Sequence, residues 1–317
     1  MTCRMLVVVA ALALEAFAQE PLFRARVEAV RLDVLVTRDG VPVRGLTTDD
    51  FEVRDNAVFQ RVTSVSARET VQLGVVLDTS GSMTGQRIAI ARAATTELVA
   101  QLAPRDTVAV VAFGDQVTSL ARQSGPEAFP LDALGRLSAG GSTALIDGIY
   151  AGLLETGPAR GPRLLLVMTD GRNNLSTITG SRVIDVARRL ETAIYPVAVE
   201  VDQDRQVIRG WLNRHDGSAQ QAHPSESVFR SDTKQGTSDA LALLHVLAEA
   251  TGGRAIEAQW DTRLGAVFRS VLEEYRQRYI VTYTPEGVRT DDGWHTLDVR
   301  VRQRGLAVRT RTRYWAD

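Results

Sequence analysis

The chain has 317 residues, and its 37 basic and 38 acidic side chains leave a formal net charge near −1. This balance excludes a nucleic-acid-binding protein that works through bulk positive charge. Apolar residues make up 44% of the sequence and charged residues 24%, which provides for at least one sizeable core and excludes a disordered or low-complexity chain.

The first eighteen residues, 1–18, are typical of a secretory signal peptide. Arg4 gives a charged start, Met5–Leu14 is an apolar run, and Ala16-Phe17-Ala18 is a small-x-small cleavage pattern. We therefore expect export, with cleavage near Ala18, to a periplasm, a cell surface or the medium. The apolar run is too short to span a bilayer, and no later run is long enough. Cys3, the single cysteine, lies in this segment, so the mature chain would contain no thiol.

Residues 19–69 form the next predicted segment, which has the period of two that half-buried strands show. The apolar residues on the buried face of its first strand are Val30, Leu32, Val34 and Val36. Asp39-Gly40 is a hairpin turn signal. We interpret Asp49-Asp50 as a solvated turn rather than a cation site, because no further spaced carboxylates accompany the pair.

Over residues 70–276 the pattern changes to alternating strands and helices. Nearly continuous apolar runs, typical of strands buried on both faces of a parallel sheet, occupy residues 71–77, 107–113, 163–169 and 193–199. Helical periods separate these runs. The alternation predicts an α/β domain with a doubly wound, Rossmann-like, mostly parallel sheet. A strand at 117–121 follows its predecessor too closely for a crossover, so we expect one antiparallel edge strand.

Two segments of the second half stand outside this alternation. Residues 201–237 are rich in Gln, Ser, Asp and Arg, and they are either an insertion at the ligand-binding side of the sheet or a disordered segment without a role. Residues 277–317 return to a period of two, with strands near 279–283, 297–301 and 308–314. We expect this C-terminal β segment and the N-terminal one to form a single small β domain that flanks the α/β domain, because each alone buries little surface.

Oxygen-bearing side chains gather in three loops of the α/β domain. The first buried strand runs into Asp78-Thr79-Ser80-Gly81-Ser82, and another ends in Thr169-Asp170-Gly171. The third loop, Gly140-Gly141-Ser142-Thr143, precedes a helix. A doubly wound sheet can bring such loops to one edge. Hard oxygen donors without His or Cys favour Mg²⁺, Mn²⁺ or Ca²⁺ over zinc.

These residues resemble a known metal site. Asp78-x-Ser80-x-Ser82, Thr143 after a glycine pair, and Asp170-Gly171 after an apolar strand are similar to the metal-ion-dependent adhesion site (MIDAS) of the von Willebrand factor type A (VWFA) domain. The resemblance implies that Ser80, Ser82 and Thr143 bind the metal through their hydroxyls. It implies that Asp78 and Asp170 bind it directly or through water. A protein partner's Asp or Glu carboxylate would complete the octahedron.

The resemblance covers roughly residues 70–276, and the flanks add to it. Leu46–Gln60 before this region, and Tyr279-Ile280-Val281 with Gly293-Trp294-His295 after it, are similar to segments of secreted bacterial VWFA-related proteins. The 201–237 insertion departs from the compact A-domain pattern. The sequence therefore predicts an exported, divalent-metal-dependent module for adhesion or protein interaction, not an enzyme.

Three alternatives to this hypothesis remain. A metal-dependent phosphate or ester hydrolase could use the same loops, because an aspartate beside Mg²⁺ can act as a nucleophile. The metal could instead only stabilise the fold of a structural component. Finally, Ser80 and Ser82 could merely cap a helix. A serine hydrolase is disfavoured because every histidine lies outside the three loops, at His215, His223, His245 and His295.

Arginines spaced by two mark the C-terminal segment. They are Arg300, Arg302, Arg304, Arg309, Arg311 and Arg313. A turn at 303–305 would place the two sets of three in one basic stripe. We interpret the stripe as a solvated sheet face that protects an edge, or else as a contact for an anionic surface.

Overall fold

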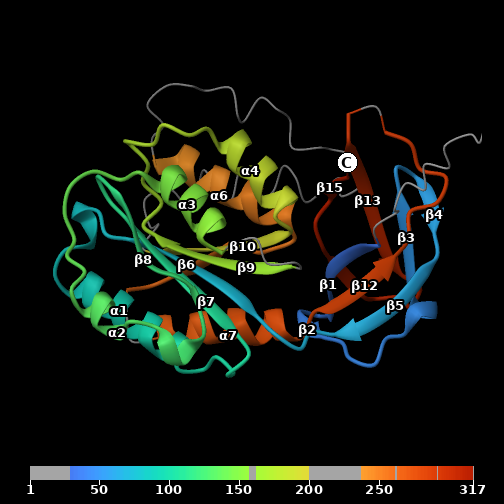
Figure 1. The fold of residues 1–317 in the computed structure, drawn as a ribbon, viewed down its shortest axis with the longest axis horizontal. Coiled ribbons are helices and arrows are strands. Elements are labelled where there is room, and N and C mark those ends of the chain that lie inside the picture. The colour runs from blue at the N-terminus through green and yellow to red at the C-terminus, as the bar shows by residue number, and fades with distance from the viewer. Residues whose placement is uncertain (1–28, 157–161, 200–236, 261–262, 291, 317) are drawn as a thin grey trace, which may run out of the picture.

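The computed structural model describes residues 29–156, 162–199, 237–260, 263–290 and 292–316. The predicted signal peptide and residues 201–236 of the predicted insertion lie outside these ranges. The described residues form two units, an α/β unit and a β unit, which lie side by side (Figure 1).

The α/β unit is built on a six-stranded sheet with the order β11-β10-β9-β6-β7-β8. Its strands are β6 (Gln72–Asp78), β7 (Thr107–Phe113), β8 (Val117–Ser124), β9 (Arg163–Thr169), β10 (Thr192–Val199) and β11 (Ile256–Ala258). Only β8 runs antiparallel, against β7, and the other neighbours pair in parallel. The buried strands β6, β7, β9 and β10 are apolar through their middle, with polar residues at their ends, as is typical of strands covered on both faces.

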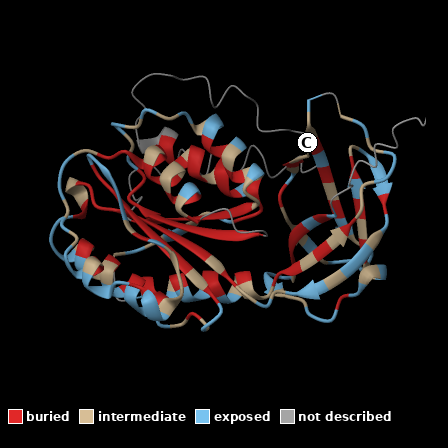
Figure 2. Ribbon diagram, viewed as in Figure 1, coloured by how far each residue is buried: buried red, intermediate tan, exposed pale blue. Residues whose placement is uncertain are grey.

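Helices cover both faces of this sheet (Figure 1). One face carries α1 (Gln86–Val99), α2 (Leu131–Gly135) and α7 (Leu264–Arg276), and the other carries α3 (Leu145–Glu155), α4 (Gly180–Arg189) and α6 (Thr237–Thr251). The described residues also contain the short 3₁₀ helices η1 (Thr48–Asp50), η2 (Gly81–Met83) and η3 (Pro126–Ala128). Figure 2 shows that the central strands of the sheet are buried, whereas the helices expose their outer sides. The edge strand β8 is largely exposed.

Two glycines let α3 lie unusually close to the sheet. A Cβ atom on Gly148 would lie 2.6 Å from Phe113 Cγ, and one on Gly152 would collide with Val76. Any larger residue at either position would push the helix outward. This close contact fixes the amino end of α3 at the edge of the sheet where β6 and β9 end.

The β unit combines both ends of the described chain. Its strands are β1 (Val30–Arg38), β2 (Val41–Pro42), β3 (Phe51–Asp55), β4 (Val58–Gln60), β5 (Val62–Ala67), β12 (Tyr279–Tyr283), β13 (Trp294–Val301), β14 (Ala307–Arg309) and β15 (Arg313–Trp315). One sheet has the order β14-β1-β12-β5, with β2 beside β1, and the other has the order β15-β13-β3-β4. A single apolar cluster, which includes Leu32, Val53, Val281 and Val299, fills the space between them.

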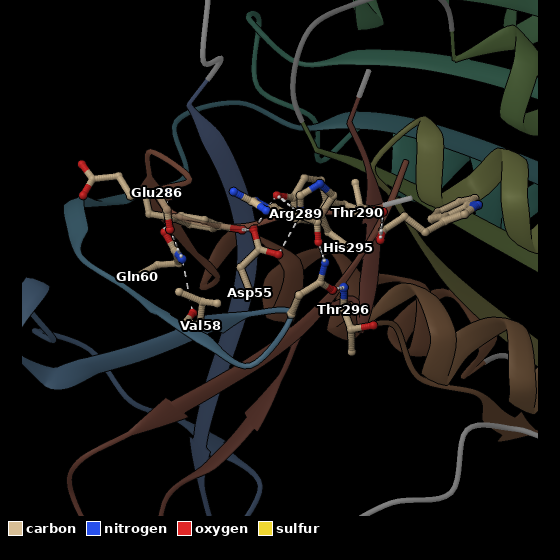
Figure 3. Close-up of polar contacts among 12 residues, drawn as sticks. Asp55, Val58, Gln60, Glu286, Arg289, Thr290, His295 and Thr296 are labelled. Carbon is tan, nitrogen blue, oxygen red and sulfur yellow. Dashed lines mark hydrogen bonds and ion pairs between the residues drawn. The ribbon is translucent and has the colours of Figure 1, made fainter. Parts of the chain in front are cut away.

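A buried carboxylate lies at the centre of the β unit. Asp55 Oδ2 accepts hydrogen bonds from the hydroxyls of Tyr283 (2.8 Å) and Tyr314 (2.6 Å), and His295 Nδ1 lies 2.8 Å from Asp55 Oδ1. Burial raises the pKa of both tyrosines. Figure 3 shows Asp55 and His295 within this network. Three partners from β12, β13 and β15 thus satisfy one carboxylate of β3.

A second polar network joins the two units. Arg278, which is fully buried, donates to the Tyr195 hydroxyl at 2.5 Å and lies 3.5 Å from Asp33 of β1. The other oxygen of Asp33 pairs with Arg68 at 2.6 Å. Burial alone would lower the pKa of Arg278, but the neighbouring Tyr195 and Asp33 raise it above its usual value. The junction is therefore held by groups that are costly to separate.

The C-terminal segment differs from the sequence prediction. The strand expected at 308–314 is two strands in different sheets, because β14 pairs with β1 whereas β15 pairs with β13. The two sets of arginines therefore do not form a single stripe. Arg309 pairs with Glu274 at 2.7 Å, and Arg311, which is buried, pairs with Glu191 at 3.0 Å. These two arginines connect the units instead of facing solvent as a group.

The helices of the described ranges include none with the length and apolar character needed to cross a membrane.

Candidate metal centre

The three oxygen-rich loops meet at the edge of the sheet where β6 and β9 end. Backbone hydrogen bonds join them directly: Gly81 N donates to Gly141 O at 2.9 Å, and Gly140 N donates to Thr79 O at 2.9 Å. Asn174, in the loop that follows β9, donates its N–H to Thr143 O at 3.0 Å. The parallel pairing of β6 with β9 brings the loops of Asp78 and Asp170 to one edge, and these backbone hydrogen bonds hold the loop of Thr143 beside them.

Asp78 ends β6 and is completely buried. Its Oδ1 accepts the Ser80 N–H at 2.9 Å, and its Oδ2 accepts the Thr169 hydroxyl at 2.9 Å. Burial is the main cause that raises the pKa of Asp78 to about 6, and the nearby charge of Asp170 also raises it. The hydrogen bonds from Ser80 and Thr169 lower this pKa but do not offset the effect of burial. Asp78 is therefore a carboxylate whose charge a cation would stabilise.

The two serines face each other. Ser80 Oγ and Ser82 Oγ lie 3.1 Å apart, with Ser80 buried and Ser82 half-buried. Ser80 precedes η2, but its side chain makes no capping hydrogen bond there. The residue before α1 is Gly85, which has no side chain to cap with. The helix-capping alternative for these two hydroxyls therefore does not describe the structure.

Thr143, which is buried, is positioned by a loop that the sequence analysis did not single out. Its N–H donates to Asn174 Oδ1 at 2.8 Å, and its carbonyl accepts the N–H of Asn174 and of Leu175. Ser176 Oγ, in the same loop, accepts the N–H of Ile146 at the start of α3 at 2.9 Å. The only sequence signal for these contacts is the run of Asn and Ser after Asp170-Gly171, which is typical of turns.

Asp170 follows β9, and its side chain is 7% exposed. Both of its oxygens contact Arg172: Oδ1 accepts the Arg172 backbone N–H at 3.2 Å, and Oδ2 lies 3.5 Å from Arg172 Nε. Gly171 between them has a φ of +81°, and a Cβ there would collide with Leu241 of α6. The positive φ and this close contact both favour glycine at the turn.

Asp115 is a further carboxylate at this edge that sequence reasoning missed. It comes just after β7, is exposed, and accepts the backbone N–H of Ser142. A Cβ on Gly141, whose φ is +76°, would collide with it. Asp115 therefore orders the glycine loop that precedes Thr143.

The donor set suits a hard divalent cation. Among the described residues, no group of three or more His, Cys, Asp and Glu side chains could hold a metal ion by itself, so a metal at this edge would need the hydroxyls as well as the two carboxylates. Burial is the main cause of the raised pKa of Asp78, so a positive charge beside this carboxylate would stabilise its ionised form. Carboxylate and hydroxyl oxygens are ligands that Mg²⁺, Mn²⁺ and Ca²⁺ accept.

The fold and this edge define an α/β domain with oxygen-rich loops at the carboxyl ends of its strands, which form a candidate cation site. The model of the von Willebrand factor type A domain family matches residues 73–253, more than half of the chain, and the chain belongs to this family. The family is often used in adhesion and protein interaction. Its α/β fold is confirmed for this chain.

Three similar proteins illustrate the range of relatives. An uncharacterized protein of Synechocystis is 31% identical over 121 residues, which are 37% of this chain and 29% of that protein, so the chain spans less than a third of its length. A von Willebrand factor type A structure from Catenulispora acidiphila is 12% identical over 92% of this chain and 75% of its own, with a TM-score of 0.46. Mussel byssus proximal thread matrix protein 1, with a zinc-occupied MIDAS motif, is 16% identical over 69% of this chain and 48% of its own, with a TM-score of 0.48.

Proposed function

We propose that this chain is an exported protein-interaction module that binds a divalent cation at its three loops and, through that cation, an acidic side chain of a protein partner. The residues that would hold the cation are Asp78, Ser80, Ser82, Thr143 and Asp170. The observation that carries the proposal is the convergence of two buried carboxylates and three hydroxyls at one edge of the sheet.

Charge explains why the partner group is a carboxylate. Asp78 and Asp170 together would neutralise a divalent ion, and the remaining ligands are uncharged hydroxyls. When bound, the cation supplies a Lewis-acidic centre that attracts one more anionic oxygen. Mg²⁺, Mn²⁺ and Ca²⁺ all fit this donor set. The partner is therefore expected to offer an Asp or Glu side chain.

The arrangement of the two units favours access to this edge. A hollow between the units is lined by Arg31 and Asp33 of β1 and by Pro162 and Thr192 at the amino ends of β9 and β10. The β unit therefore lies at the amino ends of the parallel strands, opposite the three loops (Figure 1). A partner can approach the cation without displacing the β unit.

We propose a binding function and not catalysis at these loops. Residues 78–83, 140–143 and 169–172 contain no histidine, lysine or cysteine. General acid–base catalysis would need a group that holds and releases a proton near neutral pH. Asp78 is the residue with a suitably raised pKa, and both of its oxygens already accept hydrogen bonds.

Thermal unfolding with and without metal tests the cation site. The chain from residue 19 onward is unfolded in chelator and then with Mg²⁺, Mn²⁺ or Ca²⁺. A cation at about 100 times its dissociation constant adds about 2.7 kcal/mol, or about 5–10 °C in Tm. Asp78→Ala should lose this shift, whereas Asp132→Asn, at an exposed position on α2, should keep it. Absence of both a shift and calorimetric heat at millimolar metal in the parent would refute the site.

Immobilised peptides test the partner chemistry. Each peptide carries one central Glu, and a matched set carries Gln in its place. Binding that needs both Mg²⁺ and the Glu supports the proposal. Equal binding of the Glu and Gln sets, or binding that persists in chelator, would assign recognition to another surface.

Export is tested by expressing the chain with its first eighteen residues and determining the amino-terminal residue of the purified protein. Cleavage after Ala18 would leave Gln19 as the first residue. A protein that retains Met1 would contradict export by this signal.

A further inference from the structure

Asp170 has an internal counter-ion within two residues of itself. The turn at Gly171 brings Arg172 back so that its backbone N–H and its guanidinium contact the two oxygens of the Asp170 carboxylate, at 3.2 Å and 3.5 Å. Arg172 therefore contacts the same Asp170 carboxylate that the proposed cation would bind. Arg172 is the partner with which Asp170 forms an ion pair in the described structure.

The two members of this pair differ greatly in exposure. The Asp170 side chain is 7% exposed, whereas that of Arg172 is 62% exposed. A buried carboxylate requires a compensating positive charge, especially beside Asp78. An exposed guanidinium is readily returned to water, because such ion pairs contribute little stability. The geometry therefore combines a carboxylate that needs a cation with a cation that is easily displaced.

We propose that Arg172 is an exchangeable counter-ion of Asp170, which neutralises the carboxylate until a divalent cation displaces it. This inference rests on the proposed cation site. Arg172 acts through Asp170 and is a positioning residue, not a ligand. The exchange weakens metal binding, because the ion must compete with a positive charge that is part of the chain. In the metal-free protein, Arg172 compensates the charge of Asp170, so Asp78 and Asp170 are not two adjacent carboxylates without a counter-charge.

Calorimetric titration of the metal-free chain with Mn²⁺ and with Mg²⁺ alone tests the exchange. Arg172→Gln should bind each ion about two- to fivefold more tightly than the parent at low salt, which is the range expected for removing one exposed ion pair. Arg172→Lys keeps the charge and should stay within about twofold of the parent. At 1 M salt the Debye length is about 3 Å, so the difference between parent and Arg172→Gln should disappear.

Arg300→Gln is the matched control. The Arg300 side chain is likewise 62% exposed and pairs with a neighbouring aspartate, Asp298, but it lies on β13 of the β unit. Its removal should leave the metal affinity unchanged. A second readout is the Tm in chelator, which Arg172→Gln should lower because Asp170 then faces Asp78 without a counter-charge.

The outcomes separate this inference from the proposed function. Tighter binding by Arg172→Gln, or binding by that variant alone, supports the exchange. Equal or weaker binding by Arg172→Gln, when the parent binds metal, refutes the exchange and leaves the cation site intact. If neither protein gives heat or a metal-dependent rise in Tm, both are refuted.

Discussion

The Thr169 hydroxyl donates to the Asp78 carboxylate across 2.9 Å and so links the carboxyl ends of β9 and β6. The same hydroxyl oxygen accepts the Gly171 N–H at 3.0 Å, and both side chains are fully buried. One threonine therefore sets the geometry of the loops that carry Asp78 and Asp170. Valine has nearly the same shape as threonine but lacks this hydroxyl.

Thr169→Val should weaken both stability and metal binding. The substitution keeps the shape but leaves Asp78 Oδ2 and the Gly171 N–H without their partner, at a cost of about 1–3 kcal/mol. Urea unfolding measures the loss, and Mn²⁺ titration measures the affinity. Thr169→Ser retains the hydroxyl and should preserve most of the affinity. A valine variant with parental affinity would show that Asp78 needs no such orientation.

The pH dependence of the metal-free protein should carry the signature of Asp78. Its pKa is about 6 in the folded chain against an ordinary value of 3.8, so the folded state binds a proton that the unfolded state has lost. Stability from this group is therefore full below about pH 3.8 and is lost as pH rises to about 6, by on the order of 2 to 3 kcal/mol. Unfolding in chelator across this pH range, for the parent and for Asp78→Asn, measures it. If Asp78→Asn loses stability between pH 3.8 and pH 6 as steeply as the parent does, the pH dependence comes from other groups.

The close packing of α3 predicts a large effect of a single methyl group. Gly152→Ala should destabilise the α/β unit by about 1–3 kcal/mol, because the new Cβ collides with Val76, although alanine favours the helix. Denaturant unfolding measures the change. Gly135→Ala, near the end of α2, has nothing within 4 Å of the added Cβ and should be neutral or slightly stabilising. Equal effects of the two substitutions would contradict close packing at Gly152.

Arg278→Met tests the junction between the units. The variant removes the guanidinium that contacts Asp33 Oδ2, the Tyr195 hydroxyl and the Gly252 carbonyl, so we expect a loss of about 3–5 kcal/mol. Asp33 keeps Arg68 on its other oxygen, and the Tyr195 hydroxyl keeps Glu274. Thermal unfolding by calorimetry should also show the two units unfolding at separate temperatures. Arg300→Met, at an exposed pair, should change stability by less than about 0.5 kcal/mol. A single unaltered transition in Arg278→Met would show that the junction contributes little.

Local patterns were sufficient to predict the α/β unit. The residues of β7 and β9 are nearly continuous apolar runs bounded by turn residues, and the structure has strands over the predicted ranges 107–113 and 163–169. The rule that loops at the carboxyl ends of parallel strands converge then indicated where Asp78 and Asp170 would lie. Both inferences depend on neighbours in sequence and on a general property of such sheets. The ligand roles of these residues stay predictions.

Other features depend on partners that are distant in sequence, and these were not predicted. The segment 308–314 has one alternating pattern but divides between two sheets, because β1 and β13 each offer a free edge. Arg311 is buried because Glu191 lies across the junction. The contact of Asp115 with Ser142 likewise joins two loops whose proximity no helical or strand periodicity of the sequence predicts. Sequence spacing carries no information about such contacts.

The division of the β unit between the two ends of the chain has a consequence for its synthesis. β1 pairs with β12 and β14, which a ribosome adds only after the whole α/β unit, on the order of tens of seconds later at ordinary rates of translation. Until then β1 exposes unpaired backbone groups and the apolar side chains of Leu32 and Val34. The α/β unit, in contrast, has all of its strands once β11 emerges. The nascent chain therefore completes its cation-binding unit first, while its earliest strands remain open to misassociation.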